Sequence, residues 1–428
     1  MKIVHLNTLQ FGGAARAVHR LHAGLRRLGH DSILFLPNRS TADPDVMELN
    51  HGSSLLTRLA RRVRRQGIHR SFAAYKATRP EGYELFSDDR SEYVSELPRQ
   101  LPRSDVINLH WVAGFVDYAS FFVRVHQHTP VVWSLHDMNV FTGGCHIDYG
   151  CGKYAAACGA CPQLGSNDEQ DLSRQIWRRK REALAGIRPG RLHIVPVSAW
   201  LAAEAARSSL LRNLPMTVIH CGLDVETFAP RDRLHARSVL GMPADAAVVL
   251  FVADIATSRL KGFAILAEAL RGVSGSSSPF LLSVGGGTPA LPAGMPHIHF
   301  GHVAGDRLLS VIYSAADVFV IPSLQDAFPQ TALEAIACGT PIIGSAVGGI
   351  PEIVQHGTTG YLVPPRDPRA LGAAIAELFE NPAKRAEMSA NCRRIAVEEY
   401  SLEVQARRYA QLYEKVLADS RREEFARV

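Results

Sequence analysis

The sequence contains no long hydrophobic segment of the kind that crosses a membrane. No apolar run approaches the ~20 residues that a bilayer-spanning helix requires. The first residues, MKIVHLNTLQFGG, also lack the charged start, long apolar stretch and small-residue cleavage site of a secretory signal. We therefore interpret this segment as a first β-strand and expect a cytoplasmic protein.

Two ligand-binding patterns are missing or misplaced. The segment FGGAARA (11–17) lacks the G-x-G-x-x-G spacing of a dinucleotide-binding turn. The segment DPD (43–45) has the D-x-D form of a metal site, but it lies in a polar loop after Asn38 and not at the end of a strand. We therefore expect no catalytic metal at these two aspartates.

Length and charge indicate a large globular protein with an anionic partner. A chain of 428 residues exceeds one ordinary core, and its 46% hydrophobic and 21% charged residues are typical of soluble proteins. The net charge of +6 is uneven: residues 1–200 hold 26 Lys and Arg against 18 Asp and Glu, and the remainder holds 21 against 23. This asymmetry favours a phosphate substrate, nucleic acid or an acidic membrane surface as partner.

The order of predicted elements indicates parallel sheets. Residues 2–6 form a β-branched run, apolar residues then recur at helical spacing from Ala14 to Leu28, and residues 32–36 form the next strand. This strand–helix–strand order is a βαβ unit, and the second half of the chain repeats it. Further strands are predicted at 105–109, 130–135, 192–197, 247–253, 280–287, 316–323 and 340–345, and further helices at 263–273, 329–338 and about 401–417.

The predicted fold class is therefore α/β, with two Rossmann-like doubly wound domains in tandem. We place the first domain over residues 1–218 and the second over 219–400, followed by a C-terminal helix at 401–428. The first domain also contains an Arg-rich, weakly patterned insertion at 37–100 and a Cys-rich loop at 141–165.

Two acids flank a predicted helix start in DAFPQTALEAIACGTPIIGS (326–345). The preceding strand ends near Ser323, so Asp326 lies on a loop at the carboxyl edge of the sheet, where open α/β sheets bind ligands. Pro329 suits the first turn of the helix, whose unpaired N–H groups can hold an anion. Glu334 lies in the early turns of that helix. Acids accept hydrogen bonds from hydroxyls, and N–H groups hold phosphate, so this combination points to a nucleotide sugar.

An acid, seven residues and Glu, followed by ACGTPII, resembles the signature of retaining glycosyltransferases of family 4, which have the GT-B fold. Further similar segments are FGGAARAV (11–18), SLHD (134–137), PVSAWLAAEA (196–205), GLDVETFAP (222–230), LKG (260–262), GGIPEIVQHGTTGYLVPP (348–365) and YSLEVQARRYAQLYEKVL (400–417). The segment FTGGCHIDYGCGKYAAACGACPQL (141–164) is similar to a branch found in bacterial surface-polysaccharide clusters. The resemblance implies two domains facing across a cleft, the second holding the donor and the first receiving the acceptor, with the terminal helix crossing back to the first.

The resemblance also implies roles for four charged residues. Glu334 would bind the ribose hydroxyls of the donor, and Asp326, where the family usually has Glu, would contact the transferred sugar. Lys261 would bind the diphosphate, and Arg259 would replace the family arginine that is absent at Ala256. The alternatives are a helix-entry acid at Asp326 stabilised by the helix dipole, a solvated Glu334 and an ordinary surface charge at Arg259 and Lys261.

Other residues of the predicted donor site follow from the same resemblance. His136, after a predicted strand, would hydrogen-bond the donor sugar near the reacting carbon, with a purely structural histidine as the alternative. His110 and Trp111 are weaker pocket candidates. The remaining donor-binding residues are expected to be Gly12, Gly13, Gly286, Phe328, Pro329, Gln330 and Thr331. For the first two glycines, a simple tight turn is the alternative.

Four of the seven cysteines crowd into residues 145–161: Cys145, Cys151, Cys158 and Cys161. A Cys-x-x-Cys pair that ends a tetrad suits a structural zinc ion in a cytosolic protein, with His146 as a possible further ligand. The spacing matches no standard zinc finger. Reduced packing thiols or two local disulfides are the alternatives.

A basic amphipathic helix can be drawn over residues 55–79, and the segment 174–184 is similar. In the first of these, the apolar side is formed by Leu55, Leu56, Leu59 and Val63, and the arginines are Arg58, Arg61, Arg62, Arg64 and Arg65. A solvated helix face is one interpretation. Attraction to the anionic inner face of the plasma membrane is the other, and it would suit an acceptor carried on a lipid diphosphate.

The predicted function is metal-independent, retaining transfer of a sugar from a UDP- or GDP-sugar to a glycan or lipid-linked acceptor in cell-surface polysaccharide biosynthesis. By resemblance, the leaving phosphate itself takes the proton of the acceptor, so positioning and charge stabilisation carry the reaction. A nucleotide-sugar 2-epimerase of the same fold is the nearest alternative. A zinc-bearing nucleic-acid module is disfavoured, because the basic stretches lack interleaved aromatics.

Overall fold

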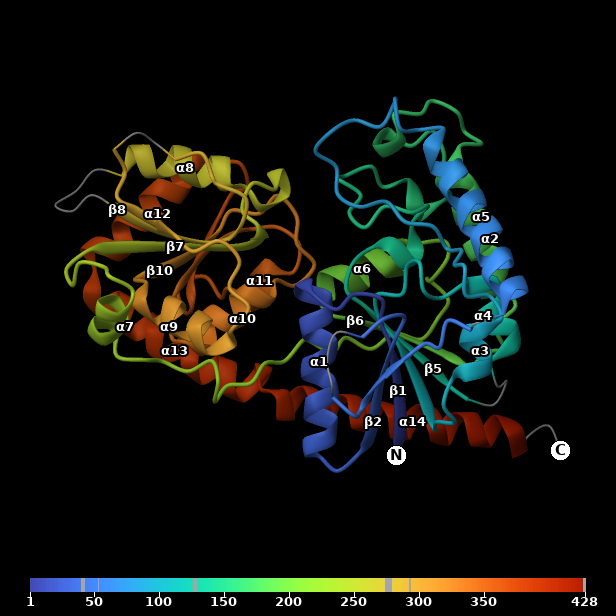
Figure 1. Cartoon of the computed structure of the whole chain (residues 1–428). Coiled ribbons are helices and arrows are strands. Elements are labelled where there is room, and N and C mark those ends of the chain that lie inside the picture. The colour runs from blue at the N-terminus through green and yellow to red at the C-terminus, as the bar shows by residue number, and fades with distance from the viewer. Residues whose placement is uncertain (40–42, 53, 126–128, 274–278, 292–293, 426–428) are drawn as a thin grey trace. The chain divides into compact units, whose positions relative to one another are not determined.

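A computed structural model describes residues 1–39, 43–52, 54–125, 129–273, 279–291 and 294–425 (Figure 1). The chain divides into two compact units. The first unit comprises residues 1–220 and 405–428, and the second comprises 221–404. Each unit is built on a six-stranded sheet in which the strand pairs are parallel.

The sheet of the first unit has the strand order β3-β2-β1-β4-β5-β6. Its strands are β1 (Lys2–Leu6), β2 (Asp31–Leu36), β3 (Val46–Glu48), β4 (Val106–Leu109), β5 (Val131–Leu135) and β6 (Leu192–Pro196). Its α-helices are α1 (Gly12–Arg27), α2 (Leu55–Ala73), α3 (Glu96–Gln100), α4 (Tyr118–Arg124), α5 (Leu172–Ala185), α6 (Ala199–Arg207) and most of α14 (Leu402–Phe425). Short 3-10 helices are η1 (Asn139–Phe141), η2 (Lys153–Ala155) and η3 (Pro162–Leu164).

The C-terminal helix α14 forms part of the core of the first unit. Its Tyr409 and Tyr413 belong to the same buried cluster as Ile3 of β1. Both tyrosines also satisfy polar groups inside the sheet: Asn108 donates to the Tyr413 hydroxyl at 2.7 Å, and the hydroxyls of Ser134 and Tyr409 lie 2.8 Å apart. Because a buried polar group without a partner costs free energy, these bonds favour seating α14 on this sheet.

The sheet of the second unit has the strand order β12-β11-β10-β7-β8-β9. Its strands are β7 (Ala247–Ile255), β8 (Pro279–Gly286), β9 (His297–His299), β10 (Val318–Ile321), β11 (Ile342–Ser345) and β12 (Gly360–Val363). Its helices are α7 (Arg233–Val239), α8 (Phe263–Gly272), α9 (Asp306–Ala315), α10 (Gln330–Ala337), α11 (Ile350–Ile353), α12 (Pro368–Glu380), α13 (Pro382–Tyr400) and the 3-10 helix η4 (Arg259–Lys261).

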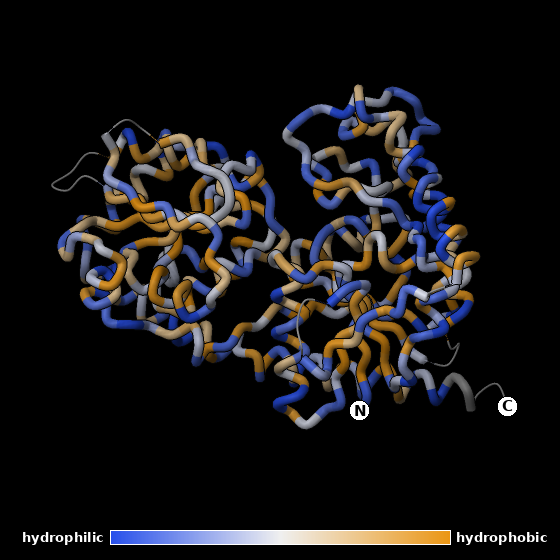
Figure 2. The backbone as a smooth tube through the Cα atoms, in the orientation of Figure 1, coloured by the Kyte–Doolittle hydropathy of each residue, from blue (hydrophilic) through white to orange (hydrophobic). Residues whose placement is uncertain are grey.

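Helices cover both faces of the sheet of the second unit (Figure 1). Leu266 and Leu270 of α8 and Ile375 of α12 are buried in one cluster with Val249 and Val320 of the sheet. Helices α9 and α10 lie on the opposite side of the strands (Figure 1). The strands of both units are correspondingly hydrophobic along their length, as expected for parallel strands buried on two faces (Figure 2).

The two sheets have the same topology. Read in chain order within each unit, both run 3-2-1-4-5-6, the order of the doubly wound Rossmann fold. The order reverses between β1 and β4 in the first unit and between β7 and β10 in the second. Ligand sites of such sheets lie at this switch point, beyond the carboxyl ends of the strands.

The predicted α/β class is confirmed, and the strands predicted from apolar runs are present with shifts of one or two residues at their ends. Three strands were not predicted: β3, β9 and β12, which have only three or four residues each. Runs that short are too brief to show an alternating pattern. Strand β3 lies inside the segment 37–100, which we expected to be weakly patterned. Among the described residues, none of the helices is long and apolar enough to span a bilayer.

Candidate active site

An ion pair joins the loops that follow β7 and β10 in the second unit. The ammonium of Lys261, in η4, lies 2.8 Å from the carboxylate of Asp326. The side chains of Lys261 and Asp326 are 34% and 12% exposed, so the pair is only partly open to solvent. It lies where the strand order reverses, which is the position expected for a ligand site.

The loop carrying Lys261 is held tightly against the end of β10. Gly262 has a φ of +71°, and a Cβ at that position would lie 2.0 Å from the carbonyl oxygen of Pro322. The N–H of Leu324 also donates to the carbonyl of Leu260 at 2.8 Å. Only glycine fits such a close approach in a left-handed conformation, so this glycine positions Lys261.

A second glycine turn holds the backbone of Asp326. The N–H of Gly349 donates to the Asp326 carbonyl at 2.9 Å. Gly348 has a φ of +58°, and an added Cβ would lie 1.9 Å from the same oxygen. In the sequence, the segment that begins at Gly348 was noted only as part of the family resemblance. The left-handed conformation of Gly348 beside the Asp326 carbonyl was therefore not predicted. The paired glycines of GGIPE (348–352) were the sequence feature that could have indicated it.

Glu334 lies inside the second unit and accepts a hydrogen bond. Its side chain is fully buried, and the hydroxyl of Tyr313 in α9 donates to its carboxylate at 3.0 Å. Burial excludes the alternative of a solvated helix residue. The sequence did not reveal Tyr313 as its partner, because the two residues lie on different helices.

Helix α10 begins at Gln330, with Pro329 at the N-cap and no side chain capping its first N–H groups. This start agrees with the expected use of proline at the helix entry. Of the neighbouring predicted donor-binding residues, Phe328 and Gln330 are buried and Thr331 is half-buried.

Arg259 is exposed and lies two residues before Lys261 in the same short helix. The position where the family usually has arginine, Ala256, is buried, and its N–H donates to the carbonyl of Gly286 at 2.8 Å. Gly286 therefore supports the loop after β7 through its backbone. The structure brings Arg259, Lys261 and Asp326 to one edge of the sheet.

In the first unit, three histidines form a hydrogen-bonded row. Nδ1 of His5 lies 3.0 Å from Nε2 of His110, and Nδ1 of His110 lies 3.2 Å from Nε2 of His136. Burial lowers the pKa of His5 to about 3, with a smaller effect of nearby His22, and lowers the pKa of His136 to about 4. Burial also lowers the pKa of His110 well below its usual value. All three rings are therefore neutral near pH 7.

Asp137, next to His136, is the centre of a second polar network. Trp111 donates from Nε1 to its carboxylate at 2.8 Å, and Nδ1 of His146 lies 2.6 Å from the same oxygen. Burial would raise the pKa of Asp137, but His146 and the N–H of Asn139 lower it below its usual value. These residues and His136 line one pocket at the carboxyl edge of the first sheet.

Gly12 and Gly13 open α1 directly after β1, as predicted from the sequence. Gly12 has a φ of +88°, a conformation that favours glycine. These glycines lie on the same sheet edge as His110 and His136, since each follows the carboxyl end of a parallel strand.

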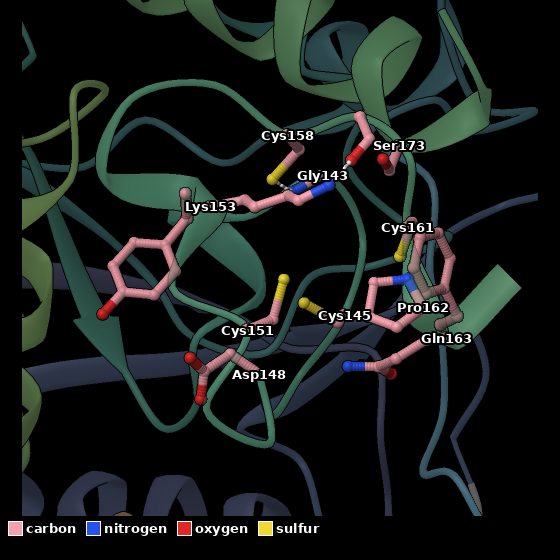
Figure 3. Close-up of a pocket in the computed structure, with 13 residues that line it drawn as sticks. Gly143, Cys145, Asp148, Cys151, Lys153, Cys158, Cys161, Pro162, Gln163 and Ser173 are labelled. Atoms are coloured by element: carbon pink, nitrogen blue, oxygen red, sulfur yellow. Dashed lines mark hydrogen bonds between the residues drawn. The ribbon is translucent and has the colours of Figure 1, made fainter. Parts of the chain in front are cut away.

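The four clustered cysteines, Cys145, Cys151, Cys158 and Cys161, line one pocket (Figure 3). All are free thiols. In the part of the chain that the structure describes, no group of three or more His, Cys, Asp or Glu side chains is placed to hold a metal ion. The structural zinc expected from the spacing is therefore not supported.

Burial raises the pKa of Cys158 to about 12 and that of Cys145 well above its usual value, so both are neutral thiols near pH 7. Cys145 and Cys161 also pack in a hydrophobic cluster with Ile176. The alternative of reduced packing thiols fits these observations.

The two basic segments of the first unit have different surroundings. On α2, the apolar residues Leu55, Leu56, Leu59 and Val63 are 80%, 79%, 59% and 61% exposed. Helix α5, which contains the segment 174–184, instead buries Ile176, Trp177 and Lys180. Of these two segments, α2 is the one that presents large apolar and basic side chains together to solvent.

Two protein-family models match the chain. The one described as "Glycosyltransferase Family 4" matches residues 11–227, and the one described as "Glycosyl transferases group 1" matches residues 246–381. The first match begins after β1 and includes β4 to β6, and the second includes all six strands of the second unit.

Curated relatives are similar over part of the chain. A D-inositol 3-phosphate glycosyltransferase of Thermobispora bispora is 32% identical over 218 residues, which are 47% of this chain and 51% of that protein. The chain thus spans about half the length of this relative. A D-inositol 3-phosphate glycosyltransferase 1 of Catenulispora acidiphila is 28% identical over 319 residues, 68% of each protein.

Solved structures are similar over nearly the whole chain. The sucrose-phosphate synthase of Thermosynechococcus elongatus has a TM-score of 0.69 at 23% identity and covers 98% of this chain and 100% of its own. Anabaena HepE in complex with UDP-glucose has a TM-score of 0.65 at 17% identity, with coverages of 97% and 100%. These similarities show the fold, which is the GT-B fold predicted from the sequence.

Proposed function

The chain belongs to glycosyltransferase family 4, and we propose that it transfers a sugar from a nucleoside-diphosphate sugar to an acceptor hydroxyl, with retention of configuration. The observation that carries the proposal is the Lys261–Asp326 ion pair at the switch point of the second sheet, just before α10. A nucleoside-diphosphate sugar needs a cation that binds its diphosphate and an acid that accepts hydrogen bonds from its sugar hydroxyls.

The proposed donor roles follow the charges of this edge. Lys261 and Arg259 bind the diphosphate and stabilise the negative charge that it gains as it leaves. An ammonium has three N–H donors, so the bond of Lys261 to Asp326 is compatible with a further bond to phosphate. Asp326 accepts from hydroxyls of the transferred sugar, and Glu334 from those of the ribose, where it exchanges its Tyr313 partner or shares it.

We propose that charge neutralisation comes from these cations and the uncapped N–H groups of α10, without a catalytic metal. Gly286, Phe328, Pro329, Gln330 and Thr331 complete the donor pocket in this proposal. The leaving phosphate takes the proton of the acceptor, so no protein nucleophile is required. UDP or GDP serves as the nucleotide, and the similarity to HepE, whose structure contains UDP-glucose, favours UDP.

The acceptor side is proposed to lie in the first unit. At the carboxyl edge of its sheet, Gly12 and Gly13 are proposed to bind the donor, and His136 to hydrogen-bond the donor sugar near the reacting carbon. Two acceptor classes have support. A glycan or lipid-diphosphate-linked acceptor in surface-polysaccharide synthesis fits the exposed apolar and basic side chains of α2, which would attach to the anionic inner face of the plasma membrane. A phosphorylated inositol fits the curated relatives, which are named D-inositol 3-phosphate glycosyltransferases.

The test begins with the donor. Thermal-shift measurements with UDP, GDP and their sugars should identify one donor that raises the melting temperature. Glu334→Gln keeps the size of the buried side chain but removes its charge, and it should abolish that stabilisation. Glu387→Gln, at an acid whose side chain is 61% exposed in the same unit, should leave it unchanged. Equal stabilisation in all three proteins would contradict the ribose assignment.

The second step identifies the product. The true donor is incubated with D-inositol 3-phosphate in one reaction and with a lipid-diphosphate-linked glycan in another, and products are analysed by mass spectrometry. A new glycosidic bond in either reaction supports transfer and chooses the acceptor class. An isomerised sugar nucleotide with no glycosidic bond would replace the proposal by nucleotide-sugar epimerisation.

A further inference from the structure

The row of His5, His110 and His136 connects the interior of the first sheet to the candidate site. His5 lies in β1 and is fully buried, His110 follows β4 and is 3% exposed, and His136 follows β5 and lines the pocket. Two hydrogen bonds hold the backbone of His110: its N–H donates to the carbonyl of Leu6 at 3.0 Å, and Nε1 of Trp133 donates to its carbonyl at 3.2 Å. The rings of His110 and His136 are stacked, with centroids 5.5 Å apart.

The two hydrogen bonds couple the tautomers of all three rings. A neutral imidazole carries one N–H and one bare nitrogen, and each bond needs one of each. If His110 donates from Nδ1 to His136, its Nε2 is bare and must accept from Nδ1 of His5. All three rings then carry hydrogen on Nδ1. In the opposite direction, all three carry it on Nε2.

The inner end of the row decides between these two states. Nε2 of His5 is buried and has no hydrogen-bond partner among the described residues. The nearest ring beyond it, His22, meets it edge-on with centroids 6.3 Å apart and directs its own Nδ1 to the hydroxyl of Ser32 at 2.8 Å. A buried N–H without a partner is rarer and more costly than a buried bare acceptor, so hydrogen on Nε2 of His5 is disfavoured.

We infer that His5 and His110 are positioning residues that hold His136 in the Nδ1–H tautomer, so that it presents a hydrogen-bond donor to an oxygen atom of the sugar substrate. That this oxygen belongs to the donor sugar rests on the proposed function. Nδ1 of His136 makes no hydrogen bond within the described part of the chain, while its Nε2 is occupied by His110. In this state His136 donates to the substrate and does not accept a proton from it. Burial keeps the three rings uncharged, which the alternating bonds require.

The tautomer can be measured without any substrate. The full-length protein labelled with ¹⁵N-histidine is examined near pH 7.5 by long-range ¹H–¹⁵N correlation, and His136 is assigned from the resonances lost in His136→Gln. A protonated Nδ1 and a bare Nε2 on His136 are expected. A protonated Nε2, or a charged ring at this pH, would overturn the inference. The ligand-free result stands even if no sugar nucleotide is ever turned over, so it separates this inference from the proposed function.

A matched pair of variants tests the role in catalysis. His110→Asn places an amide N–H about where the imidazole Nδ1 lies and can still donate to His136, whereas His110→Leu cannot. The leucine variant should release the tautomer of His136 and lower kcat/KM by about fivefold, the worth of one neutral hydrogen bond. The asparagine variant should keep both the tautomer and most of the activity. Equal activities in two folded variants with different His136 tautomers would refute the catalytic role.

Discussion

The two units share one sheet topology and differ in the chemistry of their switch points. In the first unit, the loops after β4 and β5 carry the neutral histidines His110 and His136. In the second unit, the loops after β7 and β10, the counterparts of β1 and β4, carry the Lys261–Asp326 ion pair. The two units therefore have the same fold but different side-chain chemistry at these loops. The second unit, which carries the cation Lys261, is the one that we propose binds a diphosphate.

Burial explains the difference. The histidine row reaches from the pocket to the fully buried His5, and removing water favours the uncharged ring. Lys261 remains 34% exposed and has a carboxylate beside it, so its charge is retained next to solvent. The same reasoning separates the tasks that we propose: charge stabilisation in the second unit and directional hydrogen bonding in the first.

The largest effect is expected from removing the cation of the second unit. Lys261→Met should lower kcat by about 10²–10³-fold, comparable to the loss of one preorganised charge-stabilising donor. Lys384→Met, at a partly exposed ion pair of the same unit, is the control and should change kcat less than twofold. Steady-state kinetics with the true donor provide the measurement. A normal kcat for Lys261→Met would contradict the proposal that the second unit supplies charge stabilisation through this residue.

Acid should weaken the first unit through its histidines. Unfolded imidazole has a pKa of 6.5, against about 3 for His5 and about 4 for His136 in the folded protein. The unfolded chain therefore binds more protons below pH 6.5. The free energy of unfolding should be fully retained above pH 6.5 and fall towards pH 4, by up to about 1.4 kcal/mol per pH unit for each histidine.

Tryptophan fluorescence can follow this acid effect during denaturant unfolding, because all four tryptophans lie in the first unit. His136→Gln should flatten the pH dependence. His297→Gln, at an exposed histidine of the second unit, should not. A wild-type unfolding free energy that is constant from pH 7 to pH 5 would contradict the neutral row.

A side chain added at Gly348 should overlap with the Asp326 loop and destabilise the second unit. Gly348→Ala would bring a Cβ within 1.9 Å of the Asp326 carbonyl oxygen, whereas Gly301, with nearly the same φ of +59°, has nothing within 4 Å of an added Cβ. Both alanines suffer the same backbone strain. The steric overlap should make Gly348→Ala cost about 1–3 kcal/mol more in unfolding free energy, because the loop must move. Chemical denaturation measures the difference. Equal losses would show that the turn does not press on Asp326.

The smallest effect is expected from weakening the proposed contact between α2 of the first unit and an anionic membrane. Arg62→Ala, on the exposed side of α2, should weaken binding to phosphatidylserine-containing vesicles about fivefold, since each basic residue near an anionic surface contributes about 1 kcal/mol. Arg271→Ala, at an exposed arginine of α8 in the second unit, is the control. Vesicle sedimentation at low and physiological salt tests both. Equal binding by wild type and Arg62→Ala would contradict the membrane role and favour the interpretation of α2 as a solvated helix.

Local structural features around the candidate site could be predicted from the sequence. The helix start at Pro329, the glycines at the start of α1 and the strand end before Asp326 all follow from residues close together in the chain. The partners were largely invisible, because Tyr313 and His146 contact Glu334 and Asp137 from separate segments. The cysteine spacing indicated a cluster, and the four thiols do line one pocket, but among the described residues no group of three or more His, Cys, Asp or Glu side chains is placed to hold a metal ion.

The order of strands and helices could be read from the chain alone, since burial on one or two faces imposes a periodicity that each short segment carries within itself. Contacts between residues far apart in the chain could not be predicted from the sequence in this way. Lys261 and Asp326 are 65 positions apart, and His5 and His110 are 105 apart, so their contacts exist only after parallel strands have been placed side by side. Burial in the assembled sheet then determined which of these groups keep a charge, and therefore which edge can hold a diphosphate.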